Sequence, residues 1–185
     1  KMDEHIATNL LSGIITKTKI FRSPQVTPRS LAIASLLVEQ GARRAEIVQH
    51  LYQTKTIPML KLWGRALARL QSTQDGWYVW TKISASDFEK TASGEEDMSG
   101  VIDELLVNTP KAKVVAVLYE SHQVIHGMVA GHKQVNLTEI LAPFEPRGSG
   151  ALTYIRFSEK TLDAAEEALS TRVQKELVTL FQDSV

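Results

Sequence analysis

Residues 113–120, KVVAVLYE, and 123–131, QVIHGMVAG, decide the fold. Each is a short apolar run with several β-branched side chains, a composition typical of a strand. Ser121 and His122 separate the two runs and predict a turn between them. We therefore expect this part of the chain to form a β-hairpin.

Strand and helix signals alternate on both sides of this hairpin. Before it, Asp75-Gly76 predicts a turn, residues 77–80 read as a strand, and the segments SDFE at 86–89 and SGEE at 93–96 resemble capping boxes of two short helices. After it we expect a short helix at 136–144, a strand at 151–159 and a long amphipathic helix at 161–181. The C-terminal part is therefore a mixed β and α unit.

The N-terminal part carries helical signals only. Helical spacing of apolar residues recurs at 4–16, 26–42, 44–54 and 58–70. Thr27 is placed as an N-cap, with Pro28 at the first helical position and Gly41 as terminator. The first helix is expected to be buried on most sides, because its apolar residues are Ile6, Leu10, Leu11, Ile14 and Ile15. The fold class is α/β, with a helical domain at 1–72 followed by a small mixed-sheet domain at 73–185.

Composition narrows the classes of function. The chain of 185 residues has no cysteine, which excludes disulfides, thiolate zinc sites and a thiol nucleophile. No apolar run approaches the roughly 20 residues of a membrane span, so we expect a cytoplasmic protein without a membrane partner. Residues 1–72 hold 11 of the 21 Lys and Arg residues but only 4 of the 21 Asp and Glu residues, so a basic half precedes an acidic one.

Few residues suggest chemistry directly. The five histidines lack the spacing of a helical metal site. The segment RGSGA at 147–151 is a glycine-rich loop in which Arg147 and backbone N–H groups could bind a phosphate. Lys61, Arg65 and Arg69 form a basic stripe on one helix, which is either a solvated face or a nucleic-acid contact.

The order of these segments resembles a known family. Residues 5–42, from HIATNLLSGIITKTKIF to LLVEQGA, resemble the end of the catalytic domain in DHH-family phosphoesterases, where a T-G-I-x-x-D-T-like motif precedes a helix and an LLxxGA segment. The remainder looks like the DHH-associated domain of nanoRNase, pAp-phosphatase and RecJ-type proteins. The resemblance covers residues 4 to 180, and its first segment is the more specific.

The resemblance implies metal-assisted hydrolysis of phosphate esters by two Mn²⁺ or Mg²⁺ ions. Most of the family's ligands lie upstream of the matched segments, and this chain has no Asp-His-His. Aligning SGIITKT places Lys17 where the family has an Asp ligand, and a charged lysine cannot coordinate a dication. Ser149, in FEPRGSGALTY, stands about where the family's Gly-Gly-Gly-His loop has its histidine.

The expected function is that of a fragment of a divergent DHH-type phosphoesterase-like protein. We expect no catalytic residue and no metal ligand in this chain. The expected ligand is the phosphate of a nucleotide or short oligonucleotide. The residues expected to bind it are Arg147, Gly148, Ser149 and Gly150, with Lys17, Lys19 and Arg22 contributing. A divalent metal, Mn²⁺ or Mg²⁺, is expected only in a longer active protein. The chain begins at Lys1 inside a helical pattern, so the expected partner is a missing N-terminal DHH half, and a homodimer is left open.

Two alternatives to this function stay open. One is a catalytically inactive module for regulation or protein interaction, which the lysine at position 17 favours. The other is a helical nucleic-acid-binding protein that uses Lys61, Arg65 and Arg69.

Overall fold

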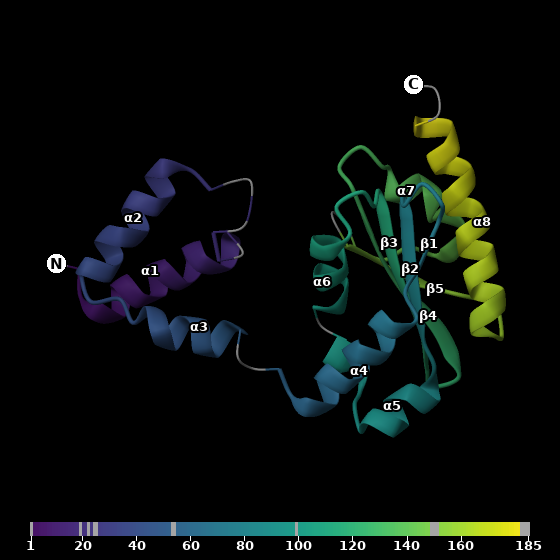
Figure 1. Ribbon diagram of the computed structural model, residues 1–185, viewed down its shortest axis with the longest axis horizontal. Helices are drawn as coiled ribbons and strands as arrows, with labels where there is room; N and C mark the ends of the chain where they lie inside the picture. The colour runs from purple at the N-terminus through teal and green to yellow at the C-terminus, as the bar shows by residue number, and fades with distance from the viewer. Residues whose placement is uncertain are drawn as a thin grey trace. The chain divides into compact units, whose positions relative to one another are not determined.

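The computed structural model describes residues 2–18, 20–21, 23, 26–52, 55–98, 100–148 and 152–181. The chain divides into two compact units, Lys1–Thr56 and Ile57–Val185, which we call the helical unit and the sheet unit (Figure 1). Each unit has a hydrophobic core of its own.

The helical unit contains α1 (Glu4–Lys17), α2 (Pro28–Glu39) and α3 (Arg44–Tyr52). The predicted cap of α2 is confirmed, because the Thr27 side chain accepts from the Ser30 N–H and Pro28 occupies the first turn. The α1 helix starts at the Asp3 carboxylate, which accepts from the Ile6 N–H at 2.8 Å. The core is small and consists of Ala7, Leu11, Ile15, Ala34, Leu37, Ala42 and Ile47.

The prediction that the first helix is buried on most sides is wrong. Leu11 and Ile15 are buried, but Ile6 is 46% exposed and Leu10 is 50% exposed. On α2, Leu36 is 57% exposed. Three short helices can cover only one face of one another, so apolar side chains on their other faces stay outside the core.

The described strands of the sheet unit form one five-stranded sheet in the order β1-β2-β3-β4-β5. The strands are β1 (Gln71–Ser72), β2 (Tyr78–Ile83), β3 (Val114–Ser121), β4 (Val124–Gly131) and β5 (Leu152–Arg156). The predicted hairpin is confirmed as β3 and β4, which pair antiparallel around a turn at His122 and Gln123. Only β2 and β3 run parallel, and the chain between them forms α5 (Ala85–Thr91), η1 (Glu95–Met98) and α6 (Val101–Asn108). The predicted α/β fold class is therefore confirmed.

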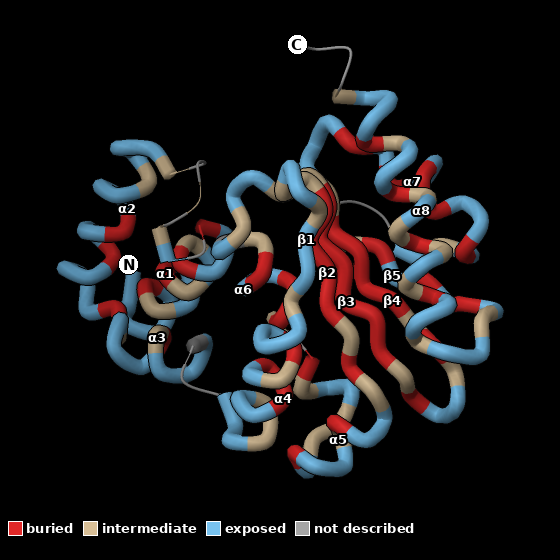
Figure 2. Tube along the Cα trace, turned by 45° about the vertical axis from the view of Figure 1, so that its right-hand side comes forward, coloured by how far each residue is buried: buried red, intermediate tan, exposed pale blue. Residues whose placement is uncertain are grey.

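Helices cover both faces of this sheet (Figure 1). On one face α8 (Leu162–Phe181) packs on β2 and β3, together with α7 (Leu137–Ile140) and η2 (Ala142–Phe144). On the other face, which we call the α6 face, α4 (Ile57–Ala68) contacts β2, and α6 contacts β3 and β4. Burial is concentrated in β2, β3 and β4 (Figure 2). Side chains of these strands lie in the cores on both faces of the sheet.

The compact units do not divide where the sequence placed the domain boundary. The expected boundary was 72–73, whereas the units divide at Thr56–Ile57, so α4 belongs to the sheet unit. The reason is packing, because Leu62, Trp63 and Ala66 of α4 lie in the core on the α6 face. Thr81 of β2 also donates to the Ala66 carbonyl at 2.6 Å. The amphipathic pattern of α4 identified its apolar side, but not the surface that covers it.

Candidate functional site

One end of the α6 face presents aromatic and polar side chains instead of aliphatic ones. Tyr119 of β3 pairs with His126 of β4, and Met128 of β4 pairs with Tyr154 of β5. Residues directly opposite on paired strands share a face, and Tyr119 and Met128 belong to the core on the α6 face. The Tyr154 side chain is 47% exposed on this face.

Arg147, the first residue of the predicted glycine loop, lies at the outer edge of β5, next to this surface. Arg147 and Tyr154 exchange two backbone hydrogen bonds, Arg147 N–H to Tyr154 carbonyl at 2.7 Å and the reverse at 2.9 Å. Gly148 has φ +98°, a conformation that L side chains rarely adopt. Arg147 and Gly148 are both exposed, so the Arg147 side chain and the Gly148 backbone face solvent beside Tyr154.

A pocket of about 400 Å³ adjoins the loop on the α6 face. It shares Leu152 and Tyr154 with the immediate surroundings of Gly148. The sheet forms its floor, and η1 and α6 form its wall. The lining residues are Glu95, Glu96, Met98, Gly100, Ile102, Asp103, Tyr119, Met128, Leu152 and Tyr154.

His126 lies beside this pocket and is kept mainly neutral near pH 7. Its ring stacks on Tyr119 with a centroid distance of 5.3 Å and an interplanar angle of 23°. Burial lowers the pKa of His126 from its ordinary value of 6.5, and the charges of Arg156 and His122 lower it further, while Glu95 opposes the shift. Burial also raises the pKa of Tyr119, so its hydroxyl stays protonated and can donate a hydrogen bond.

Glu95 is positioned by the turn between β3 and β4. The Ser121 hydroxyl donates to Glu95 Oε1 and lies 2.8 Å from His122 Nδ1, which is 3.6 Å from the same carboxylate oxygen. The arrangement differs from a nucleophilic serine site, because the hydroxyl hydrogen is directed to a carboxylate and the His122 side chain is 92% exposed. The contacts fix the Glu95 carboxylate at the mouth of the pocket.

The structure brings together only some of the predicted site residues. Arg147 and Gly148 lie side by side, whereas Ser149 and Gly150 of the same loop lie outside the described residues. Lys17 is the exposed last residue of α1, in the helical unit, and Lys19 and Arg22 also lie outside the described residues. Tyr119, Tyr154 and Glu95 were not predicted as site residues.

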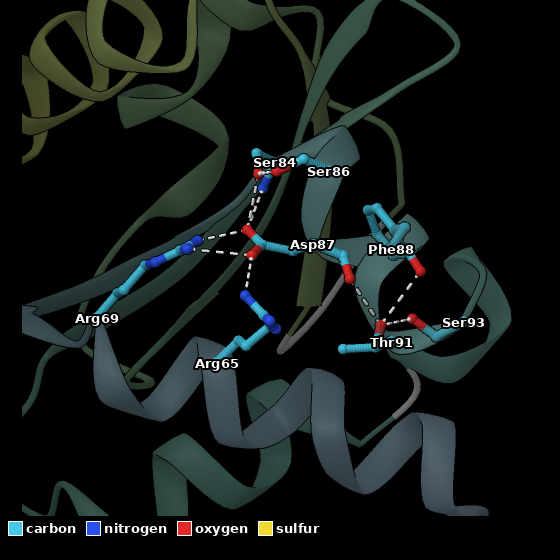
Figure 3. A network of polar contacts seen from close by, with 8 residues as sticks. All are labelled: Arg65, Arg69, Ser84, Ser86, Asp87, Phe88, Thr91 and Ser93. Carbon is cyan, nitrogen blue, oxygen red and sulfur yellow. Dashed lines mark hydrogen bonds and ion pairs between the residues drawn. The ribbon is translucent and has the colours of Figure 1, made fainter.

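The basic stripe on α4 has a structural role. Arg65 and Arg69 both bind the carboxylate of Asp87, a residue of α5 whose side chain is 0% exposed (Figure 3). Burial alone would raise the pKa of Asp87, but hydrogen bonds from Arg69 and Ser84 outweigh it and hold the pKa well below its usual range. Of the three stripe cations, Arg65 and Arg69 therefore hold α4 against α5.

The divalent metals that the family resemblance implies do not fit the residues at hand. Among the described residues, no three His, Asp or Glu side chains come close enough to hold a metal ion. At the aligned ligand position, Lys17 carries an ammonium group that repels a dication. Among the helices that the structure describes, none has both the length and the apolar composition that a membrane span requires.

Comparison with known proteins identifies a structure with a similar fold and assigns no activity to this chain. No protein-family model matches it. It is 32% identical to the uncharacterized protein MG371 of Mycoplasma genitalium over 76 residues, which are 41% of this chain and 23% of that protein. This stretch is short, and MG371 has no stated activity.

The fold is that of an exopolyphosphatase-related protein from Bacteroides fragilis. The TM-score is 0.83 at 17% sequence identity, over 96% of this chain and 52% of that chain. The present chain therefore spans about half the length of that structure. A pGpG-specific phosphodiesterase from Vibrio cholerae, with 14% identity over 82% of this chain and 52% of that chain, has a TM-score of only 0.48, which does not establish a shared fold.

Proposed function

We propose that the sheet unit recognises the phosphate of a nucleotide or short oligonucleotide in a phosphoesterase-like protein. Arg147 and Gly148 bind the phosphate, with Ser149 and Gly150 of the same loop. The proposal rests on the exposed residues Arg147 and Gly148, which we call the Arg147-Gly148 corner. Two backbone hydrogen bonds between Arg147 and Tyr154 hold this corner beside a surface of aromatic side chains. Lys17, Lys19 and Arg22 of the helical unit contribute further positive charge.

The chemistry of this corner suits a phosphate. A guanidinium presents planar, paired N–H donors that match phosphate oxygens, and hydrogen bonds to charged groups contribute about 1.5–3 kcal/mol. A glycine with positive φ lets neighbouring backbone N–H groups turn toward an anion. The aromatic side chains next to the corner add base stacking, which contributes about 1–3 kcal/mol per base.

We further propose that the chain corresponds to the end of a DHH catalytic domain and its associated domain. The DHH-like motif order and the fold shared with an exopolyphosphatase-related protein support this assignment. With Lys17 at the aligned ligand position, this chain alone is proposed to have no reaction centre. Hydrolysis would require Mn²⁺ or Mg²⁺ held by a missing N-terminal half.

Exposed apolar side chains of the helical unit support such a partner. Ile6 and Leu10 of α1 and Leu31 and Leu36 of α2 are each more than one third exposed. Contiguous apolar patches on a protein surface mark interaction sites. We propose that the remaining part of the catalytic domain covers these side chains, and a homodimer is the alternative occupant.

The phosphate site can be tested by isothermal titration calorimetry with inorganic pyrophosphate and with pAp at low salt. We expect Arg147→Ala to weaken both affinities about 10- to 100-fold, because one charge-assisted contact is lost. Lys90→Ala is the matched control, since it removes an exposed cation from α5, outside the loop. Equal affinities for the wild type and the Arg147 variant would refute the site.

Catalysis is tested on the longest form of the protein with Mn²⁺. Turnover of pAp or dinucleotides that EDTA abolishes identifies an enzyme whose missing half supplies the metal site. Binding without turnover identifies a catalytically inactive regulatory or protein-interaction module, the second candidate, which Lys17 favours.

A third candidate, a helical nucleic-acid binder, is disfavoured by the Asp87 contacts. Arg65 and Arg69 bind a buried carboxylate, so replacing them would disturb the fold together with any nucleic-acid contact. Lys61→Ala gives the clean test. If α4 bound nucleic acid, Lys61→Ala would remove about one phosphate contact. The affinity of this variant would then fall less steeply as the salt concentration rises.

A further inference from the structure

The pocket beside the Arg147-Gly148 corner has two chemically different sides. Its floor consists of side chains from the sheet, namely Tyr119, Met128, Leu152 and Tyr154. Its wall carries three carboxylates, from Glu95 and Glu96 of η1 and Asp103 of α6. A flat apolar group would therefore rest on the floor with its edge facing carboxylate oxygens.

The size and position of the pocket suit a nucleobase. Its volume of about 400 Å³ lies within the 300–1,000 Å³ range of small-molecule sites. Leu152 and Tyr154 border both the pocket and Gly148, so a phosphate at the corner and a base in the pocket can belong to one nucleotide. Tyr154 is partly exposed, and the face of its ring can stack on the base.

Glu95 is the carboxylate best placed to read the edge of the base. Ser121 donates to its Oε1 atom, which holds the side chain in place before any ligand arrives. A carboxylate has two oxygens with about four acceptor sites in total and donates no hydrogen bond. Glu95 can therefore accept from a ligand in addition to Ser121.

We infer that this pocket binds the nucleobase and prefers bases that carry an exocyclic amino group. The inference rests on the proposed phosphate site. An amino group on the base edge donates a hydrogen bond to an acceptor-only wall, whereas a carbonyl oxygen in its place meets carboxylate oxygens of like charge. The acidic wall thus discriminates among bases, while Arg147 and Gly148 hold the phosphate that all nucleotides share.

Two matched pairs of nucleotides test the preference by calorimetry. GMP and IMP differ only in the exocyclic amino group. CMP and UMP differ in the amino group, which is a carbonyl in UMP, and in ring N3, which carries a hydrogen only in UMP. We expect GMP to bind about 10-fold more tightly than IMP. We expect a smaller ratio for CMP over UMP, because the N3–H of UMP offers the wall a donor in place of the lost amino group.

Glu95→Gln tests the residue that reads the base. The amide keeps an acceptor for Ser121 but also presents donors, so we expect the GMP to IMP ratio to fall below about 3-fold, through weaker GMP binding. Glu120→Gln is the matched control, because Glu120 lies next to Ser121 in β3 and lines a different pocket. If Glu95→Gln fails to fold, Glu96→Gln at an exposed position of the same turn replaces it.

The outcomes separate this inference from the proposed function. Nucleotides that bind through Arg147 with equal affinities within both pairs would overturn the base preference and leave the phosphate site standing. An unchanged GMP to IMP ratio in both the Glu95 and Glu96 variants would overturn the role of the acidic wall. If neither nucleotides nor pyrophosphate bind, the phosphate site fails and the base pocket fails with it.

Discussion

At the scale of a single residue, the Asp87 side chain is fully buried and held by charged and polar partners. Its carboxylate accepts from Arg65, from Arg69, and from the backbone N–H and hydroxyl of Ser84 (Figure 3). The sequence predicted a capping box here, but placed its serine at Ser86. The structure uses Ser84 with Asp87 at the third helical position, because this register turns the carboxylate inward to the two arginines.

Asp87→Asn is expected to lower the free energy of unfolding by about 3 kcal/mol, at the lower end of the range for a broken buried ion pair. The amide cannot pair with two guanidinium groups, but Arg65 and Arg69 are partly exposed and recover some hydration. Urea unfolding followed by circular dichroism measures the change. Asp163→Asn is the control, because Asp163 binds Lys82 at a solvent-exposed position and its loss should leave the urea midpoint nearly unchanged.

The same carboxylate predicts a pH dependence. Because the folded pKa of Asp87 lies below the ordinary value of 3.8, its stabilising contribution is complete above that value and is lost as the pH falls further. We expect the difference in unfolding free energy between wild type and Asp87→Asn to be constant from pH 7 to pH 5. It should narrow below about pH 4. A difference that stays constant down to pH 2.5 would show that folding does not lower the pKa of Asp87.

At the scale of elements, local patterns predicted most strands and helices but not their partners. The hairpin of β3 and β4 followed from apolar runs around a turn. The helix expected at 136–144 is split into α7 and η2, because Pro143 has no N–H to continue the helical ladder. The parallel pairing of β2 with β3 joins residues more than 30 apart in sequence, and nothing local specifies it.

Two glycines of the sheet unit predict opposite effects of the same substitution. A Cβ at Gly127 of β4 would lie 2.8 Å from Ile155 Cγ1, so we expect Gly127→Ala to destabilise the fold by about 1–3 kcal/mol through overpacking. At Gly64 of α4, no described atom outside the helix backbone lies within 4 Å of a new Cβ. Gly64→Ala should stabilise the fold by about 0.5–1 kcal/mol, because alanine favours the helix.

Thermal unfolding of the two variants, compared side by side, measures this contrast. Opposite shifts of the melting temperature are expected. A neutral Gly127→Ala would mean that the β4–β5 pair can move apart by several tenths of an ångström without cost, contrary to the close packing of Ile155.

The candidate site could be predicted only in part, because local sequence patterns do not show which distant residues come together. The glycine loop at 147–151 was found from its composition, and strand alternation could have placed Tyr119 and His126 on one face. Glu95 could not be found from the sequence, because Ser121 lies 26 residues away and only the packing of η1 on the sheet brings them together. Residues that share a site through tertiary packing leave no local signal.

At the scale of the whole molecule, the two units differ in how much of their apolar surface they bury. Among its described residues the helical unit has seven in its core, whereas the sheet unit has two large clusters on opposite faces of the sheet. Small cores rarely supply more than a few kcal/mol of net stability. The sheet unit therefore should account for most of the cooperative unfolding of the chain.

A chain of residues 57–185 tests this division. Because α4 packs on the α6 face, this chain keeps both clusters complete, and we expect it to unfold cooperatively with nearly the urea midpoint of the full chain. Residues 1–56 alone should show little cooperative unfolding, because Ile6, Leu10 and Leu36 stay 46%, 50% and 57% exposed when the small core has formed. As a control, a chain cut at the sequence-based boundary, 73–185, lacks α4 and leaves Asp87 without Arg65 and Arg69. If 73–185 were as stable as 57–185, α4 would not be part of the sheet unit, and the boundary predicted from the sequence would be the better one.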